Sequence, residues 1–583
     1  MRAIDNQRFS IVYGNKLALA LLLGVLIAPY FVNLSGPSLW DSTEAFYAET
    51  PREMLELKSF VIPYFNYVPR LNKPPLAYWL VLPFYRMFGI SHVAERIVAA
   101  LGASILILLT FGLGAALFDR RVGLLGAAIV ATTPRLILLA QKSIIDVTFT
   151  ALVTAALALF WLIMSRRESS SARTTPGAFA WPSDRWVIIA FYAAVGLGIL
   201  TKGPLALVLV GGTIFFYLLV MRRWNLLRLM NIPLGLLVLA GIVLPWYGAI
   251  YVRLGWEPIA SFIMRENIAR FASEIDWSRR GPFYYFSVLA GDFFPWSLYL
   301  IPAIVLGYRR GRQNDERSPI AFLFAWVAFI LLFFSLAHNK HEYYILPLYP
   351  AAATLIGHFF AQLGQSFLGH GERRMMHVIT VIVAALLTAG GILLGVIIGR
   401  FFSGGWMALP PLALSLGGLW LFGQIRLSRL TRLPFSLVGI MLASAFLYRL
   451  VFLPLIEPYR PIKPLCEVIA REVRTEDLVG TYNVAAPSMV FYLRRRIFQV
   501  FQPEELRALL ASHRRIFCVM PESDFHHLER LFPDQLTVWE RRPMLTLRLN
   551  LLLEGRAKRR LPHVLLVSNR PRESGTSSAE PSH

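Results

Sequence analysis

Residues 39–85 read LWDSTEAFYAETPREMLELKSFVIPYFNYVPRLNKPPLAYWLVLPFY. The first half of this stretch is acidic, and the second half places basic residues among prolines and aromatic residues. On either side, residues 17–34 and 97–118 are almost free of polar side chains, which predicts membrane-spanning helices. Charge buried at a membrane surface is costly and is usually retained for a function. We therefore expect residues 35–92 to form an external loop at the floor of an active site. Its notable charged residues are Asp41, Glu44, Glu49, Arg52, Glu53, Arg70 and Lys73.

The composition of the whole chain indicates a polytopic membrane protein. Of its 583 residues, 56% are hydrophobic and 16% are charged, and its mean hydropathy is +0.54. Soluble domains carry about 25% charged residues. The net charge of +23 could indicate nucleic-acid binding. However, no nucleic-acid motif accompanies it, and many of the basic residues fall in loops expected to face the cytoplasm.

Hydropathy predicts about thirteen membrane-spanning helices. A span needs roughly 20 apolar residues, and segment 75–89 is too short, so we expect a helix lying in the interface there. Basic residues before the first run resemble a signal peptide, but no clear cleavage site follows, which favours an uncleaved helix. The predicted spans are 14–34, 93–118, 122–140, 146–165, 185–201, 203–221, 231–252, 283–307, 319–337, 343–363, 376–399, 407–424 and 434–455.

Loop charge predicts the orientation of these helices. With the N-terminus in the cytoplasm, the six inner loops hold 18 arginines. The four short outer loops hold one cation each, at Lys142, Lys202, Lys340 and Arg400. Lysine and arginine concentrate in cytoplasmic loops, so this arrangement places the opening loop and the region after the last span outside the cytoplasm.

Residues 456–569 predict a small periplasmic α/β domain, followed by a disordered tail at 570–583. Amphipathic helical patterns at 461–473, 503–513 and 522–532 alternate with strand patterns at 477–483, 514–521, 545–553 and 563–569. The two cysteines, Cys466 and Cys518, both lie in this region. They could form a disulfide in an oxidising compartment, although two buried free thiols are equally ordinary.

The unusual polar residues lie in the predicted outer loops. Asp41 or Glu44 could serve as a general base toward an acceptor hydroxyl, or the two could cap the next helix. Lys73, held by Pro74 and Pro75, could bind a phosphate or simply reach the interface. Lys202 and Lys340 could likewise simply extend their charged ends to the membrane interface. Together with nearby arginines they could form a cationic cluster for an anionic headgroup or a phosphate leaving group. Those arginines are Arg52, Arg70, Arg265 and Arg270.

The other candidates each have a structural alternative. Tyr343 and Tyr344 could donate to a phosphate or belong to an aromatic belt. His338 and His341 with a carboxylate could bind a divalent metal, although their spacing is not diagnostic. Asp146 could be functional or could complement a helix dipole. Asp292, placed inside a predicted span, is a functional candidate unless an arginine pairs with it.

Several ordered motifs make the chain resemble a known family. FYAETPREML, NKPPLAYWL, LTKGPLALVL, RENIARF with FFPWSLYLIP, and SLAHNKHEYYILPLYPA occur in this order over roughly residues 15–360. This pattern resembles the bacterial lipid-A aminoarabinose transferases and protein O-mannosyltransferase-like enzymes, which are integral-membrane glycosyltransferases of the GT-C type.

The resemblance implies an inverting transfer of a sugar from a polyprenyl-phosphate donor, at the outer face of the inner membrane, to lipid A, another glycan or a protein. It implies a carboxylate from the opening loop, and Lys73 and Tyr344 as holders of the donor phosphate. Lys202 and Lys340 match basic positions of the motifs. The family's usual Asp-Glu pair corresponds to Thr43-Glu44, and Asp41 lies two residues earlier, so helix geometry would put Asp41 and Glu44 on one face.

The sequence also bears on the type of sugar donor and on the alternatives to a transferase. The polar motifs face outward and no nucleotide-binding motif is present, which favours a lipid-linked donor over a cytoplasmic nucleotide sugar. A lipid or sugar transporter is an alternative, but transporters tend to show internal repeats, and we find none. A membrane scaffold that binds a partner through its tail domain is a second alternative.

Overall fold

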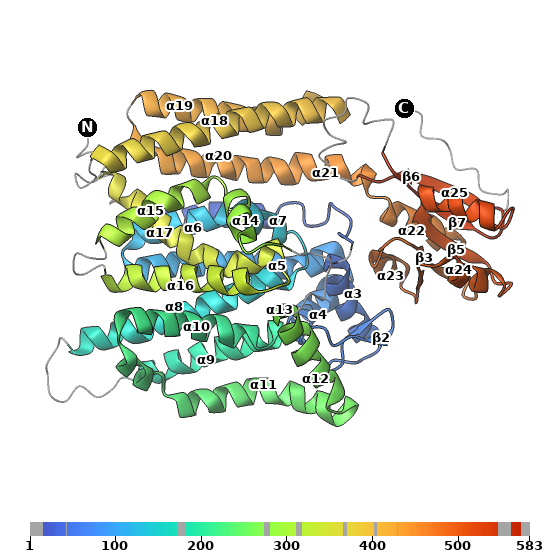
Figure 1. Cartoon of the computed structure of the whole chain (residues 1–583), viewed down its shortest axis with the longest axis horizontal. Coiled ribbons are helices and arrows are strands. Elements are labelled where there is room, and N and C mark those ends of the chain that lie inside the picture. Colours follow the sequence, from blue (N-terminus) through green and yellow to red (C-terminus); the bar gives the residue numbers. More distant parts are fainter. Residues whose placement is uncertain are drawn as a thin grey trace.

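A computed structural model shows a bundle of long helices with a small sheet domain at one end (Figure 1). Along the helices the bundle is apolar, and its outer helices leave large apolar side chains exposed, including Leu237 and Val252. Exposed apolar faces of this extent are suited to contact with lipid. The structure describes residues 15–41, 43–171, 182–272, 280–310, 317–364, 370–401, 405–427, 429–545 and 561–572.

All thirteen predicted apolar segments are helical, but the count of thirteen spans is not confirmed. Within the described residues, nine helices are long and apolar enough to cross a membrane, or ten if one bent pair counts as a span. Their main helices are α5 (His92–Leu117), α8 (Ile145–Ser171), α9 (Pro182–Lys202), α11 (Ile232–Leu254), α16 (Arg317–Leu336), α17 (Tyr349–Ala361), α18 (His370–Phe401), α19 (Leu409–Arg426) and α20 (Leu433–Leu447).

Four predicted spans are short or broken, because hydropathy counts apolar residues without locating helix ends. Proline at position 134 starts a new helix and interrupts the segment 122–140. The pair α14 and α15 bends by 110° at residues 293–295. The shorter helices are α2 (Lys16–Ile27), α6 (Arg120–Ala131), α7 (Pro134–Leu139), α10 (Leu205–Met221), α12 (Glu257–Ile263), α13 (Arg270–Ala272), α14 (Tyr284–Asp292), α15 (Trp296–Arg310) and α21 (Leu453–Ile456).

The opening loop folds into two helices joined by a hairpin. Its elements are α3 (Thr43–Glu56), β1 (Tyr64–Phe65), β2 (Val68–Pro69) and α4 (Leu76–Phe88), which includes the short helix predicted at 75–89. The hairpin turns at Asn66 and Tyr67, whose φ values of 56° and 61° suit a tight two-residue turn. Ten of the 14 residues of α3 are buried, which shows that this loop is packed rather than loosely exposed.

The C-terminal region is the predicted α/β domain. Its sheet has the strand order β4-β3-β5-β7-β6, in which β3, β4 and β5 are parallel and β7 is antiparallel to both of its neighbours. The elements are α22 (Ile462–Glu472), β3 (Leu478–Tyr482), α23 (Ser488–Leu493), β4 (Phe498–Val500), α24 (Pro503–Leu510), β5 (Ile516–Pro521), α25 (Glu522–Leu531), β6 (Thr537–Pro543) and β7 (His563–Ser568).

The sequence patterns located most of this domain. The helices at 461–473, 503–513 and 522–532 and the strands at 477–483, 514–521 and 563–569 are confirmed. The short elements α23, β4 and β6 were missed, and most of the strand predicted at 545–553 lies outside the described residues. Cys466 and Cys518 are both free and buried in different hydrophobic clusters, so the disulfide alternative is wrong.

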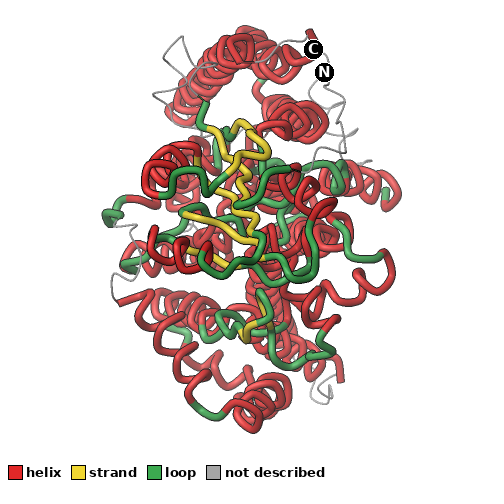
Figure 2. The backbone as a smooth tube through the Cα atoms, turned by 90° about the vertical axis from the view of Figure 1, so that its right-hand side faces the viewer, coloured by secondary structure: helices red, strands yellow, loops and turns green. Residues whose placement is uncertain are grey.

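The C-terminal domain rests directly on the opening loop. The Asp41 carboxylate accepts a hydrogen bond from the Ser488 amide at 3.0 Å, and Asn66 exchanges two bonds of 2.9 Å with the backbone of Ile497. Viewed from this end, the sheet overlies the ends of the bundle helices (Figure 2). The predicted outer segments and the C-terminal domain therefore lie at the same end of the molecule.

Candidate functional site

The predicted outer motifs converge on one polar pocket. Its lining comes from the opening loop, the starts of α8 and α10, the end of α9, the segment around α13 and the segment before α17. The space between its walls, including the open mouth, is about 520 Å³. The lining residues are Thr43, Tyr47, Lys73, Ile145, Asp146, Lys202, Leu205, Glu266, Asn267, Arg270, Tyr343 and Tyr344.

Lys202 is placed by a sharp break between two helices. It is the last residue of α9, and Gly203 follows with φ +73°. A Cβ at Gly203 would lie 2.8 Å from the Phe262 ring, so both the backbone conformation and the close contact favour glycine. The Lys202 ammonium forms an ion pair with Asp146, in the first turn of α8, and lies 5.4 Å from the centre of the Tyr344 ring.

Lys73 belongs to a second set of charges in the same pocket. It lies in the turn before α4, where Pro74 and Pro75 exclude a regular helix. Its Nζ atom is 3.4 Å from Glu266 Oε2, and the same oxygen is 3.0 Å from Arg270 Nη2. Burial lowers the pKa of the Lys73 ammonium to about 8, although the Glu266 carboxylate acts in the opposite direction.

Two backbone hydrogen bonds bring Arg270 to the tyrosines. The His338 amide donates to the Phe271 carbonyl at 3.0 Å, and the Asn339 amide donates to the Arg270 carbonyl at 3.3 Å. The side chains of Arg270 and Tyr344 both line the pocket. Residues 264–269 form a π-helical turn, a conformation often found at functional sites.

The pocket carries three cations and two carboxylates. Lys73, Lys202 and Arg270 outnumber Asp146 and Glu266 by one positive charge. Tyrosine hydroxyls and the Asn267 side chain add uncharged polar groups. Such an arrangement can bind a singly charged anion and can stabilise negative charge that develops on it.

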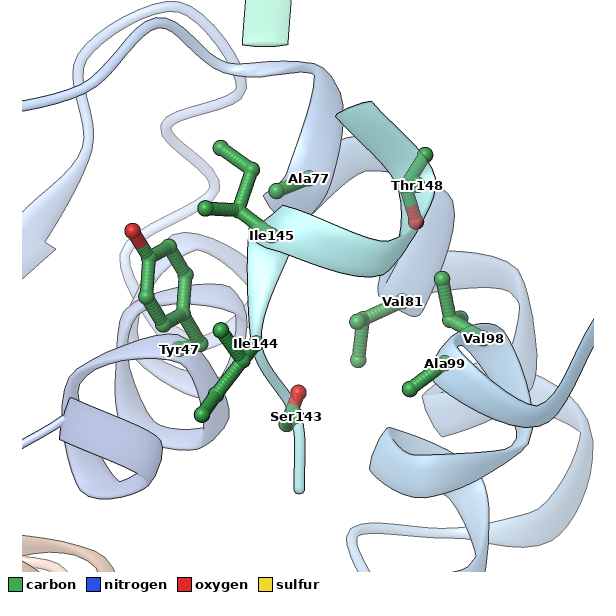
Figure 3. A pocket seen from close by; sticks show the side chains of 9 residues that line it. All are labelled: Tyr47, Ala77, Val81, Val98, Ala99, Ser143, Ile144, Ile145 and Thr148. Carbon is green, nitrogen blue, oxygen red and sulfur yellow. The ribbon is translucent and has the colours of Figure 1, made fainter. Parts of the chain in front are cut away.

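A small apolar pocket adjoins this site. Tyr47 and Ile145 line both pockets, and Val81, Val98 and Ala99 line the apolar one (Figure 3). Packing against α4 and α5 thus positions the start of α8, and with it Asp146, which directly follows Ile145.

Asp41 and Glu44 do not line the polar pocket. Glu44 is fully buried, and its Oε1 atom lies 2.8 Å from Nε of the equally buried Arg96. It also accepts the Trp40 amide, while Asp41 accepts the Ser488 amide. Because α3 begins at Thr43, Asp41 precedes the helix, and the expectation that helix geometry puts both carboxylates on one face is wrong.

Other predicted candidates lie outside the pocket lining. Arg52 forms ion pairs with Glu49 and Glu56, and Arg70 lies 4.1 Å from the centre of the Phe46 ring. The Lys340 ammonium donates to the Ala337 carbonyl. Asp292 ends α14 at the bend, not inside a continuous span, and Arg135 Nε donates to it at 2.7 Å. From the sequence, pairing with an arginine was the alternative to a functional role for Asp292, and the structure shows this pairing.

The described residues provide no cluster of three metal-ligating side chains. His338 Nδ1 lies 3.1 Å from the Phe271 carbonyl oxygen, and the rings of His341 and Tyr343 stack 5.3 Å apart. The donor set that could hold a metal therefore does not assemble around these histidines in the part of the chain that the structure describes.

Sequence reasoning missed four polar residues of the pocket lining, which are Thr43, Tyr47, Glu266 and Asn267. Glu266 and Asn267 lie within the RENIARF motif, whose i, i+4 spacing of Glu266 and Arg270 was the available signal. Tyr47 gave no signal, because a tyrosine near a membrane is ordinary.

Comparison with known proteins finds similarity to membrane enzymes over part of the sequence and a shared fold over most of the chain. The model of the dolichyl-phosphate-mannose-protein mannosyltransferase family matches residues 21–254. An uncharacterised protein of Aquifex aeolicus is 28% identical over 520 residues, which cover 87% of this chain and 92% of that protein. The crystal structure of ArnT from Cupriavidus metallidurans bound to undecaprenyl phosphate aligns with a TM-score of 0.74 at 19% identity, covering 96% of this chain and 99% of ArnT. The chain shares the fold of ArnT.

The likeness to curated enzymes covers only part of the sequence. The undecaprenyl phosphate-α-4-amino-4-deoxy-L-arabinose arabinosyl transferase of Erwinia tasmaniensis is 32% identical over 342 residues. That match covers 58% of this chain and 59% of the enzyme. The fold shared with ArnT, by contrast, extends over nearly the whole chain.

Proposed function

We propose that this protein is a GT-C-type membrane glycosyltransferase, which moves a sugar from a polyprenyl-phosphate donor to an acceptor at the periplasmic face of the bacterial inner membrane. The polar pocket carries this proposal, because its single excess positive charge matches the single negative charge of a phosphodiester-linked sugar. Support also comes from the ArnT structure, which shares the fold and is described as bound to undecaprenyl phosphate. Neither the fold nor these relatives favour the transporter alternative.

In the proposed reaction, Lys73, Arg270 and Tyr344 hold the donor phosphate. The bond between the sugar's anomeric carbon and the phosphate oxygen breaks, and that carbon bonds to an acceptor oxygen on the opposite face. The acceptor proton passes to a carboxylate, and polyprenyl phosphate leaves with its new negative charge. The pocket cations stabilise that charge, which can contribute roughly 3–4 kcal/mol per donor group.

We assign the role of base to Asp146. It is a pocket carboxylate on the first turn of α8, and its ion pair with Lys202 fixes its position in the pocket. Glu266 lies between Lys73 and Arg270, where a bound phosphate would compete with it for both cations. Asp41 and Glu44, proposed from the sequence, remain alternatives that the same experiment separates.

We also propose the orientation derived from loop charge. The N-terminus is cytoplasmic, and the polar pocket and the C-terminal domain are periplasmic. The helices α3 and α4 of the opening loop, which borders the pocket, lie at the same end of the bundle as the C-terminal domain (Figure 1), so both face the same side of the membrane in this orientation.

The test compares envelope lipids and glycans by mass spectrometry in cells with and without the gene. In the deletion strain we expect an acceptor molecule that is lighter by one sugar. The wild-type gene should restore the full mass of this molecule, and the gene for the Asp146→Asn variant should not. Restoration by Asp146→Asn and failure of Asp41→Asn or Glu44→Gln, at equal protein levels, would assign the base to the opening loop instead. Unchanged glycans and lipids despite normal expression of the protein would contradict the proposed transfer.

A further inference from the structure

A second pocket lies where the C-terminal domain meets the opening loop. Its walls are the tip of the β1–β2 hairpin at Asn66, the connection 473–477 between α22 and β3, the segment leading into β4, and Arg514 before β5. The space between these walls, including the open mouth, is about 1620 Å³. None of its lining residues belongs to the polar pocket described above.

The sheet topology gathers arginines at this pocket. Strands β4, β3 and β5 are adjacent and parallel, so the chain enters all three from the same edge of the sheet. The sequence Arg-Arg-Ile-Phe leads into β4 at 495–498 and into β5 at 514–517, and Arg474 precedes β3. Residues far apart in the sequence thus bring four arginines to one pocket: Arg474, Arg495, Arg496 and Arg514.

One of these arginines fixes the pocket wall. The Arg495 guanidinium donates to the carbonyls of Arg474, Thr475 and Asp477, at 3.0, 3.2 and 2.6 Å. On the opposite side, the paired hydrogen bonds between Asn66 and Ile497 hold the hairpin tip against the segment before β4. The pocket is therefore shaped in advance of any ligand, which reduces the entropy that binding would cost.

The charge of this pocket is not balanced by its own acidic residue. Asp477 is bound by Arg515, with Oδ2 and Nη2 2.6 Å apart. Among the residues that the structure describes, Arg514 donates from Nε to the Glu476 carbonyl. The side chains of Arg474 and Arg496 are exposed, and neither forms a hydrogen bond or an ion pair with the residues that the structure describes. Like charges held together in this way repel one another, and an anion between them would offset that repulsion.

We propose that this pocket binds a phosphate group, presented by a lipid headgroup or as free phosphate. Guanidinium groups match the oxygens of phosphate in pairs, and clusters of arginine are a recurring mode of phosphate recognition. Arg474, Arg496 and Arg514 would contact the anion, and Arg495 would keep the 474–477 connection in place. The site is separate from the donor pocket, and the proposal does not depend on the transfer reaction.

The test uses the full-length protein in nanodiscs of zwitterionic phosphatidylcholine, which has no net charge. Binding of inorganic phosphate and of soluble, short-chain phosphatidylglycerol is measured by calorimetry, in the Lys73→Ala background so that the donor pocket contributes little. We expect the triple variant R474Q/R496Q/R514Q to bind at least ten-fold more weakly. The matched control R471Q/R507Q/R530Q removes three exposed arginines elsewhere in the same domain and should bind as before.

The results separate the two sources of phosphate. Binding of both probes would mean that the pocket recognises the phosphate group itself, and binding of the lipid alone would mean a headgroup site. No binding to either probe would overturn the proposal. Equal loss in the test and control variants would also overturn it, because net charge rather than this pocket would then explain binding. Equal melting temperatures of the variants would confirm that folding is unaffected.

Discussion

Replacing Lys73 with alanine should nearly abolish sugar transfer while leaving the protein folded. Lys73 is one of three pocket cations, and its removal leaves two cations against two carboxylates. A hydrogen bond to a charged group contributes about 1.5–3 kcal/mol, and a donor to charge that develops in the transition state about 2.7–4 kcal/mol. Without Lys73, Glu266 is still paired with Arg270, and it competes more strongly with the donor phosphate for that arginine. We therefore expect kcat/KM to fall by about 10³-fold.

The structural cost of this substitution should be small. The Lys73 side chain is 21% exposed, and its contact with Glu266 is long, at 3.4 Å. A partly exposed pair of this kind contributes about 0–1 kcal/mol to the free energy of unfolding. Expression and melting temperature should therefore stay near those of the wild type.

The assay measures release of polyprenyl phosphate from a labelled donor in proteoliposomes. The control is Arg86→Ala, which removes an exposed cation on α4 that lies outside the pocket lining. A kcat/KM for Lys73→Ala within three-fold of the wild type, with Arg86→Ala unchanged, would refute the assignment of Lys73 to the donor phosphate.

Four further predictions follow from the same contacts. Because the pKa of Lys73 is lowered to about 8, donor affinity should fall as the pH rises through 8. The Lys73→Arg variant stays charged in this range and should not lose affinity. Measurements of donor affinity between pH 6 and 10 would check both expectations. Asp146→Asn should lower kcat at least 100-fold while donor binding persists, as measured by single-turnover kinetics. Glu44→Gln, which breaks a fully buried pair with Arg96, should destabilise the protein by roughly 3 kcal/mol; an unchanged melting temperature with lost turnover would instead indicate catalysis. After denaturation, two thiols should react with an alkylating reagent without prior reduction, because Cys466 and Cys518 are free.

The fold was largely predictable because membrane helices follow from local composition. Apolar runs such as α5 and α16 are long enough to identify one at a time, and a helix satisfies its own backbone hydrogen bonds. The errors came at breaks. The interruption at Pro134 and the bend near Asp292 leave the hydropathy of the segments unchanged, so a count of apolar residues cannot detect them.

The candidate site was predictable in its motifs but not in its contacts. Lys73, Lys202, Arg270 and Tyr344 were all named from the sequence, and all line one pocket. The two carboxylates in that pocket are Asp146, which sequence reasoning ranked below Asp41 and Glu44, and Glu266, which it missed. A carboxylate in a sequence does not reveal whether it faces a pocket or a buried arginine.

The sequence by itself determined that the protein is a bundle of membrane helices whose polar motifs share one end, because hydrophobicity and loop charge act residue by residue along the chain. Only the tertiary structure decided the partners of the charged groups. Glu44 meets Arg96 across 52 residues, and Lys73 meets Glu266 across 193 residues. The reason is physical: an ion pair needs two groups within about 4 Å, and helix packing, not sequence spacing, sets that distance.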